Sequence, residues 1–285
     1  MQEQLPQHKA YMLSDFGIRL REMISSQDGN APMTYAHQDD YYVMGLVEGG
    51  SGRGLIDFKE VCVSRGDMFV IQPGQVHRFI SSNDIEGWLL FVDSGFIGHA
   101  EKRIFNGFLL STTSPLFKID NKRHNELRQV IAMIASRIDT GDDDLTRTTI
   151  IRLTETFTGI VVEAIRETGA LQEKHGGRQM EIALSFLHLL AEHITINRSP
   201  SYYASLLNIS PGYLNEIVKE VTGMSVTLYI RNELILQAKR LLVHTGLSIK
   251  EISNMLGIDD YAYFSRIFMQ TTGISPSAFR LKNHG

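Results

Sequence analysis

Between about Tyr11 and Leu110 the hydrophobic residues form short runs separated by turn-forming clusters, a pattern typical of β-strands. The strongest runs are residues 41–47, 54–57, 61–63, 68–71 and 88–92. The first run ends at Glu48-Gly49-Gly50-Ser51-Gly52, a cluster that predicts a turn before the next strand. Many short strands with closely spaced turns predict a barrel or a sandwich.

From about Asp120 the hydrophobic positions recur every three or four residues, which indicates amphipathic helices. One helix is predicted around Leu127–Ile138. A second begins after Asp142-Asp143-Asp144, where negative charge suits the helix dipole, and reaches Ile165. The cluster Glu173-Lys174-His175-Gly176-Gly177 then breaks the pattern. We expect a barrel domain at 1–115, a helical segment at 116–172, a linker at 173–178 and a helical domain at 179–285.

The last region contains one motif twice. In each copy a small residue is followed four positions later by Asn or Gly, then by Ile, and then by a polar residue that can cap a new helix. The first copy is Ala204, Asn208, Ile209 and Ser210, with Pro211 next, and the second is Ser253, Gly257, Ile258 and Asp259 or Asp260. A small residue lets two helices cross closely, Asn or Gly tolerates a left-handed turn, and Ile fills the core between the helices.

Each copy is followed by a matching tail, Thr222-Gly223-Met224-Ser225 and Thr272-Gly273-Ile274-Ser275, and the two tails lie 50 residues apart. One copy alone would equally fit a plain helical bundle with short connections. The repeat favours two helix-turn-helix units, whose second helices would each enter a major groove of DNA.

Bulk properties agree with this picture but do not establish it. The net charge is −4, which argues against a non-specific nucleic-acid binder. Residues 178–285 hold ten Lys/Arg and eight Asp/Glu, so the excess of positive charge there is small. The single cysteine, Cys62, excludes an intrachain disulfide and a multi-cysteine metal site. Met1–Ala10 is unlike a signal peptide and no apolar run is long enough for a membrane helix, so we expect a soluble cytoplasmic protein without membrane association.

The region from about Met180 to Lys282 closely resembles the tandem helix-turn-helix domain of the AraC/XylS transcription regulators. The matching stretches include Ile209-Ser210-x-x-Tyr213-Leu214, Gly223-x-Ser225-x-x-x-Tyr229-Ile230, Ser248-Ile249-x-Glu251-Ile252, Tyr263-Phe264-x-Arg266-x-Phe268 and Gly273-x-Ser275-Pro276-x-x-x-Arg280. The resemblance implies a central helix, about Val226 to His244, between the two recognition helices. The chain departs from the family pattern at Val218 and Ile258, where Phe is usual, and at Met269, where Lys or Arg is common.

By the same resemblance, the exposed side of each recognition helix contacts DNA. The predicted residues are Gly212, Asn215, Glu216 and Lys219 in the first helix and Tyr261, Ala262, Ser265 and Arg266 in the second. Asn can pair with adenine and Arg with guanine through two hydrogen bonds each. For Arg266, a phosphate contact or an ion pair with Asp259 or Asp260 stays open. Tyr263 is expected to pack inward with Phe264 and Phe268.

In the first region, Gly66–His77 resembles the second motif of the cupin barrels, whose histidine points into the barrel. Metal-binding cupins add His-x-His and a glutamate in their first motif, where this chain has His37-Gln38-Asp39. The set is incomplete, so we expect no metal and no other cofactor, although Asp39 could supply an oxygen ligand. The predicted ligand-pocket residues are Tyr35, His37, Tyr42, His77, Arg78 and Trp88, although the strand run around Trp88 favours a core position for that residue over a pocket position.

These observations predict an α+β protein: an N-terminal cupin-like β-barrel with flanking helices, followed by an all-α domain with two helix-turn-helix units. The expected function is a sequence-specific, ligand-responsive transcription activator with no catalytic residues. Its expected partners are an operator in double-stranded DNA, RNA polymerase, a small-molecule effector and a second copy, bound through Leu127–Ile138 and Ile150–Ile165. The alternatives are a metal-dependent cupin enzyme fused to a DNA-binding domain, and a regulator with an empty barrel controlled by a protein partner.

Overall fold

The computed structural model describes residues 6–10, 14, 16–23, 34–111, 115–138, 143–169 and 177–283. These residues divide into two units, 6–169 and 177–283, each with its own hydrophobic core. Most of the linker predicted at 173–178 lies outside the described residues, and the first helix of the second unit begins within it, at Gly177.

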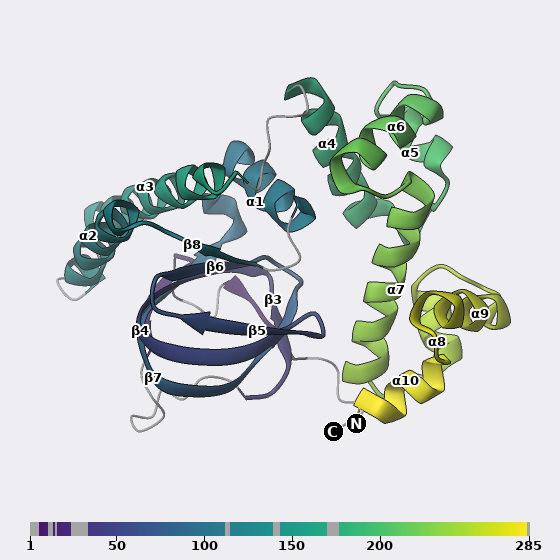
Figure 1. The fold of residues 1–285 in the computed structure, drawn as a ribbon, viewed down its shortest axis with the longest axis horizontal. Coiled ribbons are helices and arrows are strands. Elements are labelled where there is room, and N and C mark those ends of the chain that lie inside the picture. The colour runs from purple at the N-terminus through teal and green to yellow at the C-terminus, as the bar shows by residue number, and fades with distance from the viewer. Residues whose placement is uncertain are drawn as a thin grey trace. The chain divides into compact units, whose positions relative to one another are not determined.

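The first unit is built on one curved sheet (Figure 1). Its strands are β1 (Gln7–His8), β2 (Ile18–Met23), β3 (His37–Asp39), β4 (Tyr41–Ile56), β5 (Lys59–Ser64), β6 (Asp67–Ile71), β7 (Val76–Asp93) and β8 (Leu116–Lys118). The strand order is β1-β3-β7-β4-β6-β8, with β2 added to β7 and β5 added to β4. All pairs are antiparallel except β1 with β3.

The prediction of a turn at residues 48–52 is wrong, because β4 continues through that segment to Ile56. Its pairing with β7 shifts register between Val47 and Gly49, between Gly49 and Ser51, and between Arg53 and Gly54. Such bulges bend a strand without ending it. Gly50 has a φ of 62°, and a Cβ there would lie 1.9 Å from the carbonyl oxygen of Asp84. The glycines therefore let two long strands curve around the barrel.

Side chains of β4 and β7 alternate between the two faces of the sheet, as strand geometry requires. Tyr41, Val43, Leu89 and Phe91 belong to the cluster inside the barrel. The neighbouring positions face the other way, toward the helices, and include Tyr42, Met44, Leu46, Leu90 and Val92. The sheet is therefore apolar on both faces where the helices cover it.

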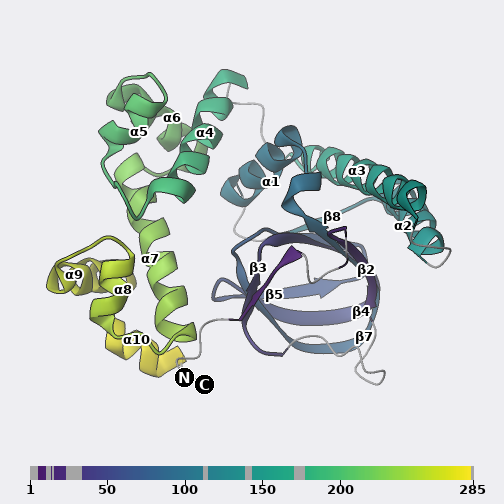
Figure 2. The ribbon, with the colours of Figure 1, turned by 180° about the vertical axis from the view of Figure 1, so that it is seen from behind.

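The helices of this unit are α1 (His99–Ser111), α2 (Asn121–Ile138) and α3 (Asp144–Glu167), which lie over the outer face (Figures 1 and 2). The predicted helices are confirmed, and Asp143 caps α3 by accepting from the N–H groups of Leu145 and Thr146. Two segments differ from prediction. Residues 99–111 are helical within the expected barrel domain, and Leu116–Lys118 is a strand because it pairs with β6, a distant partner that no local pattern shows.

The second unit contains helices and no strands among its described residues. Its helices are α4 (Gly177–His193), α5 (Pro200–Leu206), α6 (Pro211–Thr222), α7 (Val226–His244), α8 (Ile249–Met255), α9 (Tyr261–Thr272) and α10 (Pro276–Asn283). The central helix implied by the resemblance is confirmed as α7. Leu234 and Ala238 of α7 share one buried cluster with Leu214 of α6 and Phe264 of α9, so α7 joins the two helix-turn-helix units into one body.

Candidate nucleic-acid interface and barrel cavity

Both turns of the repeat have the left-handed backbone that the sequence predicts. Asn208 has a φ of 54° and Gly257 a φ of 71°. Ala204 and Ser253 are fully buried where the helices cross. A Cβ on Gly257 would lie 1.9 Å from the carbonyl oxygen of Thr195, so this turn has room only for glycine. The turns set the direction in which α6 and α9 leave the core.

The helices after the turns begin at the predicted caps. The Ser210 hydroxyl accepts from the N–H of Tyr213 at 3.2 Å. The Asp260 carboxylate accepts from the N–H groups of Ala262 and Tyr263 at 2.9 and 3.1 Å, which identifies Asp260 rather than Asp259 as the cap of α9. The first turn of each helix is therefore held by a side chain and lies exposed.

The two recognition helices expose the same positions. Leu214, Ile217 and Val218 of α6 are buried, as are the equivalent Phe264, Ile267 and Phe268 of α9. On the opposite side the exposed predicted residues are Gly212, Glu216 and Lys219 in α6 and Tyr261, Ala262 and Arg266 in α9. Each helix thus presents one solvent-facing side from its capped end onward, and these contacts with DNA stay predictions.

Asn215 and Ser265 differ from the other predicted residues because they are only half exposed. The Asn215 side-chain oxygen accepts from the backbone N–H of Val226 at 3.1 Å, at the start of α7. A two-bond contact with adenine uses both the oxygen and the nitrogen of the amide. The structure therefore gives Asn215 a role in fixing α6 against α7, which the sequence did not indicate.

The inward position predicted for Tyr263 is wrong, since its side chain is 46% exposed. Phe264 and Phe268 lie one turn apart on the buried side, whereas Tyr263 falls at its margin. The Arg266 guanidinium lies 5.6 Å from the centre of the Tyr263 ring. In the described part of the chain no ion pair joins Arg266 to Asp259 or Asp260. Tyr263 and its equivalent Tyr213 are exposed residues that aligning the two repeats could have found.

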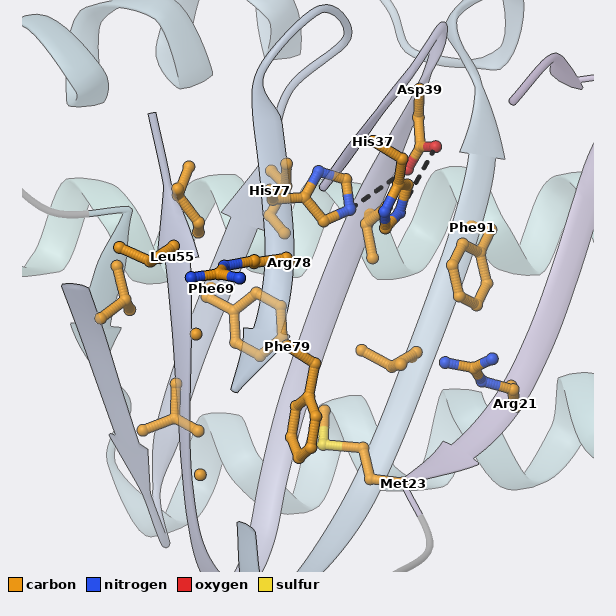
Figure 3. A pocket seen from close by; sticks show the side chains of 18 of the residues that line it. Arg21, Met23, His37, Asp39, Leu55, Phe69, His77, Arg78, Phe79 and Phe91 are labelled. Carbon is orange, nitrogen blue, oxygen red and sulfur yellow. Dashed lines mark ion pairs between the residues drawn. The ribbon is translucent and has the colours of Figure 1, made fainter. Parts of the chain in front are cut away.

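The first unit has a cavity of about 300 Å³ inside the barrel, which is open to solvent on one side (Figure 3). Its apolar wall includes Leu55, Phe69, Phe79, Leu89 and Phe91. Its polar lining includes His8, Arg19, Arg21, Glu22, His37, Asp39, Arg53, His77 and Arg78. Of the predicted pocket residues, His37, His77 and Arg78 line this cavity.

The other three predicted pocket residues do not line it. Tyr42 and Trp88 face the helices, because each is one position out of phase with the inward-facing residues of its strand, and burial raises the pKa of Tyr42 to about 12. Tyr35 is 49% exposed, and its hydroxyl lies 3.1 Å from Nε2 of His8. The expectation for Tyr42 and Tyr35 as lining residues is therefore wrong, and for Trp88 the core position, not the pocket position, is the one the structure shows.

At one end of the cavity the Asp39 carboxylate lies among three imidazoles. Its oxygens are 3.1 Å from Nδ1 of His8, 3.9 Å from Nε2 of His37 and 3.4 Å from Nε2 of His77. Burial, reinforced by His77, lowers the pKa of His37 to about 4, and burial also lowers the pKa of His77. Burial raises the pKa of Asp39. Both histidines are therefore neutral near pH 7.

His8 is the member of this cluster that the sequence did not indicate. It lies on β1, a strand of two residues, whose parallel pairing with β3 sets His8 opposite Asp39. The pairing joins positions 31 residues apart, and no hydrophobic alternation marks so short a strand.

The arginines form a second polar group in the cavity. Arg21 lies 5.5 Å from the centre of the Phe91 ring, and burial followed by repulsion from Arg19 lowers its pKa. Among the described residues no carboxylate forms an ion pair with Arg19 or Arg21. The cavity thus places two cationic side chains beside an aromatic wall.

Comparisons with known proteins agree with both halves of this geometry. A family model described as the AraC-like ligand binding domain matches residues 25–145, and a helix-turn-helix domain model matches residues 203–282. The chain belongs to the AraC/XylS family of transcription regulators. Membership in the AraC/XylS family accounts for the order of the two units and points to regulation of transcription rather than to an enzyme.

Relatives of this AraC/XylS protein match over most of their length. The HTH-type transcriptional activator RhaR of Salmonella dublin is 24% identical over 247 residues, 86% of each chain, and so is RhaR of Salmonella typhimurium. Among solved structures, ToxT from Vibrio cholerae covers 94% of this chain and 98% of its own at 16% identity, with a TM-score of 0.43. The C-terminal domain of AraT from Geobacillus stearothermophilus covers 35% of this chain and 84% of its own at 29% identity, with a TM-score of 0.34.

In the part of the chain that the structure describes, no helix has both the length and the apolar character needed to cross a membrane.

Proposed function

We propose that this chain is a cytoplasmic transcription activator that binds a specific operator through α6 and α9 and responds to a small molecule in the barrel cavity. The observation that carries the proposal is the duplicated recognition surface. Two helices with the same buried side, each capped at its first turn and joined by one central helix, expose equivalent positions from one body. Helices presented in this way fit the major groove.

The lining of the cavity favours an effector with an anionic group and an apolar body. Arg19 and Arg21 supply positive charge at a site walled by aromatic and aliphatic side chains. An arginine that is partly buried without a carboxylate partner gains most from a ligand that brings one, because both charges are then desolvated together. An aromatic or aliphatic carboxylate meets these requirements.

We also propose that the chain forms a homodimer through the helices that cover the barrel. Met133 and Ile138 of α2 and Leu145 of α3 are large hydrophobic side chains with at least 42% of their surface exposed. Burying them against the same helices of a second copy would remove this apolar surface from water. RNA polymerase is the proposed partner through which the bound activator acts.

The experiment combines operator binding with induction. We expect the full chain to bind DNA upstream of its target genes in mobility-shift assays, and its melting temperature to rise with a carboxylate from a metabolite library. Arg21→Ala should abolish the ligand-induced rise and the induction of a reporter, while affinity for the operator stays unchanged. Ligand responses that are equal in Arg21→Ala and the unchanged chain would contradict the proposed cavity role.

A further inference from the structure

We propose that His8, His37, Asp39 and His77 bind one divalent transition-metal ion, with Zn²⁺ as the probe of choice, at the polar end of the barrel cavity. One ligand atom from each of His8, His37 and Asp39 lies within 4.8 Å of the others. The Nε2 atom of His77 lies 3.4 Å from the second oxygen of Asp39, as Figure 3 shows beside His37. This inference does not depend on the proposed effector.

Contacts with backbone carbonyl groups determine the orientation of the His37 and His77 rings, and in both rings Nε2 faces Asp39. Nδ1 of His37 lies 3.1 Å from the carbonyl oxygen of Tyr35, and Nδ1 of His77 lies 3.1 Å from that of Gln75. A carbonyl oxygen only accepts, so each Nδ1 carries a hydrogen, and in the neutral ring each Nε2 then carries a lone pair. Both lone pairs point toward a carboxylate, which also accepts. A cation bound between these groups, either a proton or a metal ion, makes such an arrangement favourable.

The distances between the side chains fit a metal ion bound among them. A tetrahedral ion bonded at about 2.0–2.1 Å holds its ligand atoms about 3.3 Å apart. The contacts of Asp39 with the imidazoles, at 3.1, 3.4 and 3.9 Å, lie around that spacing. One proton on Asp39 would satisfy one imidazole and leave the other facing an acceptor. Imidazole with carboxylate is a donor set that suits zinc, nickel and iron rather than magnesium or calcium.

The surroundings of the cluster resemble those of metal sites in other proteins. Metal-binding histidines bond their second ring nitrogen to an oxygen, which holds the ring in place. Here all three histidines do so, because Nε2 of His8 lies 3.1 Å from the hydroxyl of Tyr35. His37 and Asp39 are 6% and 4% exposed. Since His8 comes from β1, an ion would also fasten this short strand to the barrel.

The test uses the full-length chain, freed of metal by a chelator and titrated with Zn²⁺ in isothermal calorimetry. We expect one ion per chain, removal by excess chelator, and a higher melting temperature with zinc. Asp39→Asn and His8→Ala should each weaken zinc binding by roughly 10–100-fold or more, since loss of even an outer partner has that effect. His99→Ala, which removes an exposed histidine of the same unit, should bind zinc unchanged.

X-ray absorption of the zinc-loaded, unaltered chain gives a result that does not depend on how the variants fold. We expect a shell of nitrogen and oxygen with at least two imidazoles. A sulfur ligand, which would indicate the exposed Cys62, or a shell of oxygen alone would overturn the proposal. Failure of the unaltered chain to bind zinc, or equal binding by His8→Ala and His99→Ala, would overturn it as well.

Discussion

Glu216 and Arg266 occupy the same position in the two recognition helices but carry opposite charges. An arginine donates to guanine or to phosphate, whereas a glutamate accepts from the amino group of cytosine. The two helices therefore cannot read the same bases in the same way. Because Arg266 lies beside the exposed ring of Tyr263, its side chain has a partner that limits its freedom before DNA binds.

Replacing Arg266 with Ala should weaken operator binding by about 1–3 kcal/mol and relax the preference at one base pair, because a two-bond contact with guanine is lost. Titrations on operator variants at two salt concentrations measure both effects. Gln270→Ala, an exposed change on the same helix, is the control. A loss equal for every sequence, with a salt slope lower by about one, would assign Arg266 to phosphate instead.

Trp88→Ala should lower stability without changing the ligand response. The side chain is half-buried against the helices outside the barrel, so the expected loss is about 2–3 kcal/mol, less than the cost for a fully buried tryptophan. Urea unfolding of the full chain gives the free energy of unfolding. Loss of the ligand-induced rise in melting temperature in folded Trp88→Ala would show that Trp88 contributes to the cavity after all.

At the scale of elements, the two helix-turn-helix units are alike in caps and turns but differ in how tightly the turns fit. The turn at Asn208 accommodates a side chain, whereas a side chain at Gly257 would collide with the backbone of Thr195. The second helix-turn-helix unit is further stabilised by Arg198, which donates to the carbonyl oxygens of Leu256 and Gly257 at 2.8 Å each. The position of α9 thus depends on contacts with the segment before α5.

Gly257→Ala should lower the free energy of unfolding of the helical domain by about 2–5 kcal/mol. The reason is that a residue with a left-handed backbone gains a Cβ that overlaps the carbonyl oxygen of Thr195. Gly273→Ala is the matched variant: its φ is 80°, but a Cβ there meets nothing within 4 Å. It should cost only about 1–2 kcal/mol. Thermal unfolding compares them, and equal losses would mean that the turn yields to accommodate the methyl group.

For the molecule as a whole, the shared core around α7 holds the recognition helices at one fixed separation. They should therefore enter successive major grooves on one face of the duplex, about 34 Å apart, or bend the DNA to meet them. Hydroxyl-radical footprinting with the full chain should show two protected segments one helical turn apart for each protomer. Protection of one short segment would contradict simultaneous binding by both helices.

The sequence by itself determined what depends on neighbours a few positions away. The capped start of each recognition helix, the left-handed residues at Asn208 and Gly257, and the bounds of α7 all follow from local patterns or from the family resemblance that those patterns carry. Capping and turn chemistry act within about four residues, so they can be read directly along the chain. The repetition of the motif then indicated that the helical domain binds DNA.

Only the tertiary structure decided what depends on distant pairing. Strand alternation shows that Tyr41 and Tyr42 face opposite sides, but which side is the cavity follows from the closing of the sheet. The bond from Val226 to Asn215 is formed between two helices, and His8 reaches Asp39 only because β1 pairs with β3. A cluster of ligands needs atoms brought within a few ångströms, and the folded backbone, not local sequence, sets those distances.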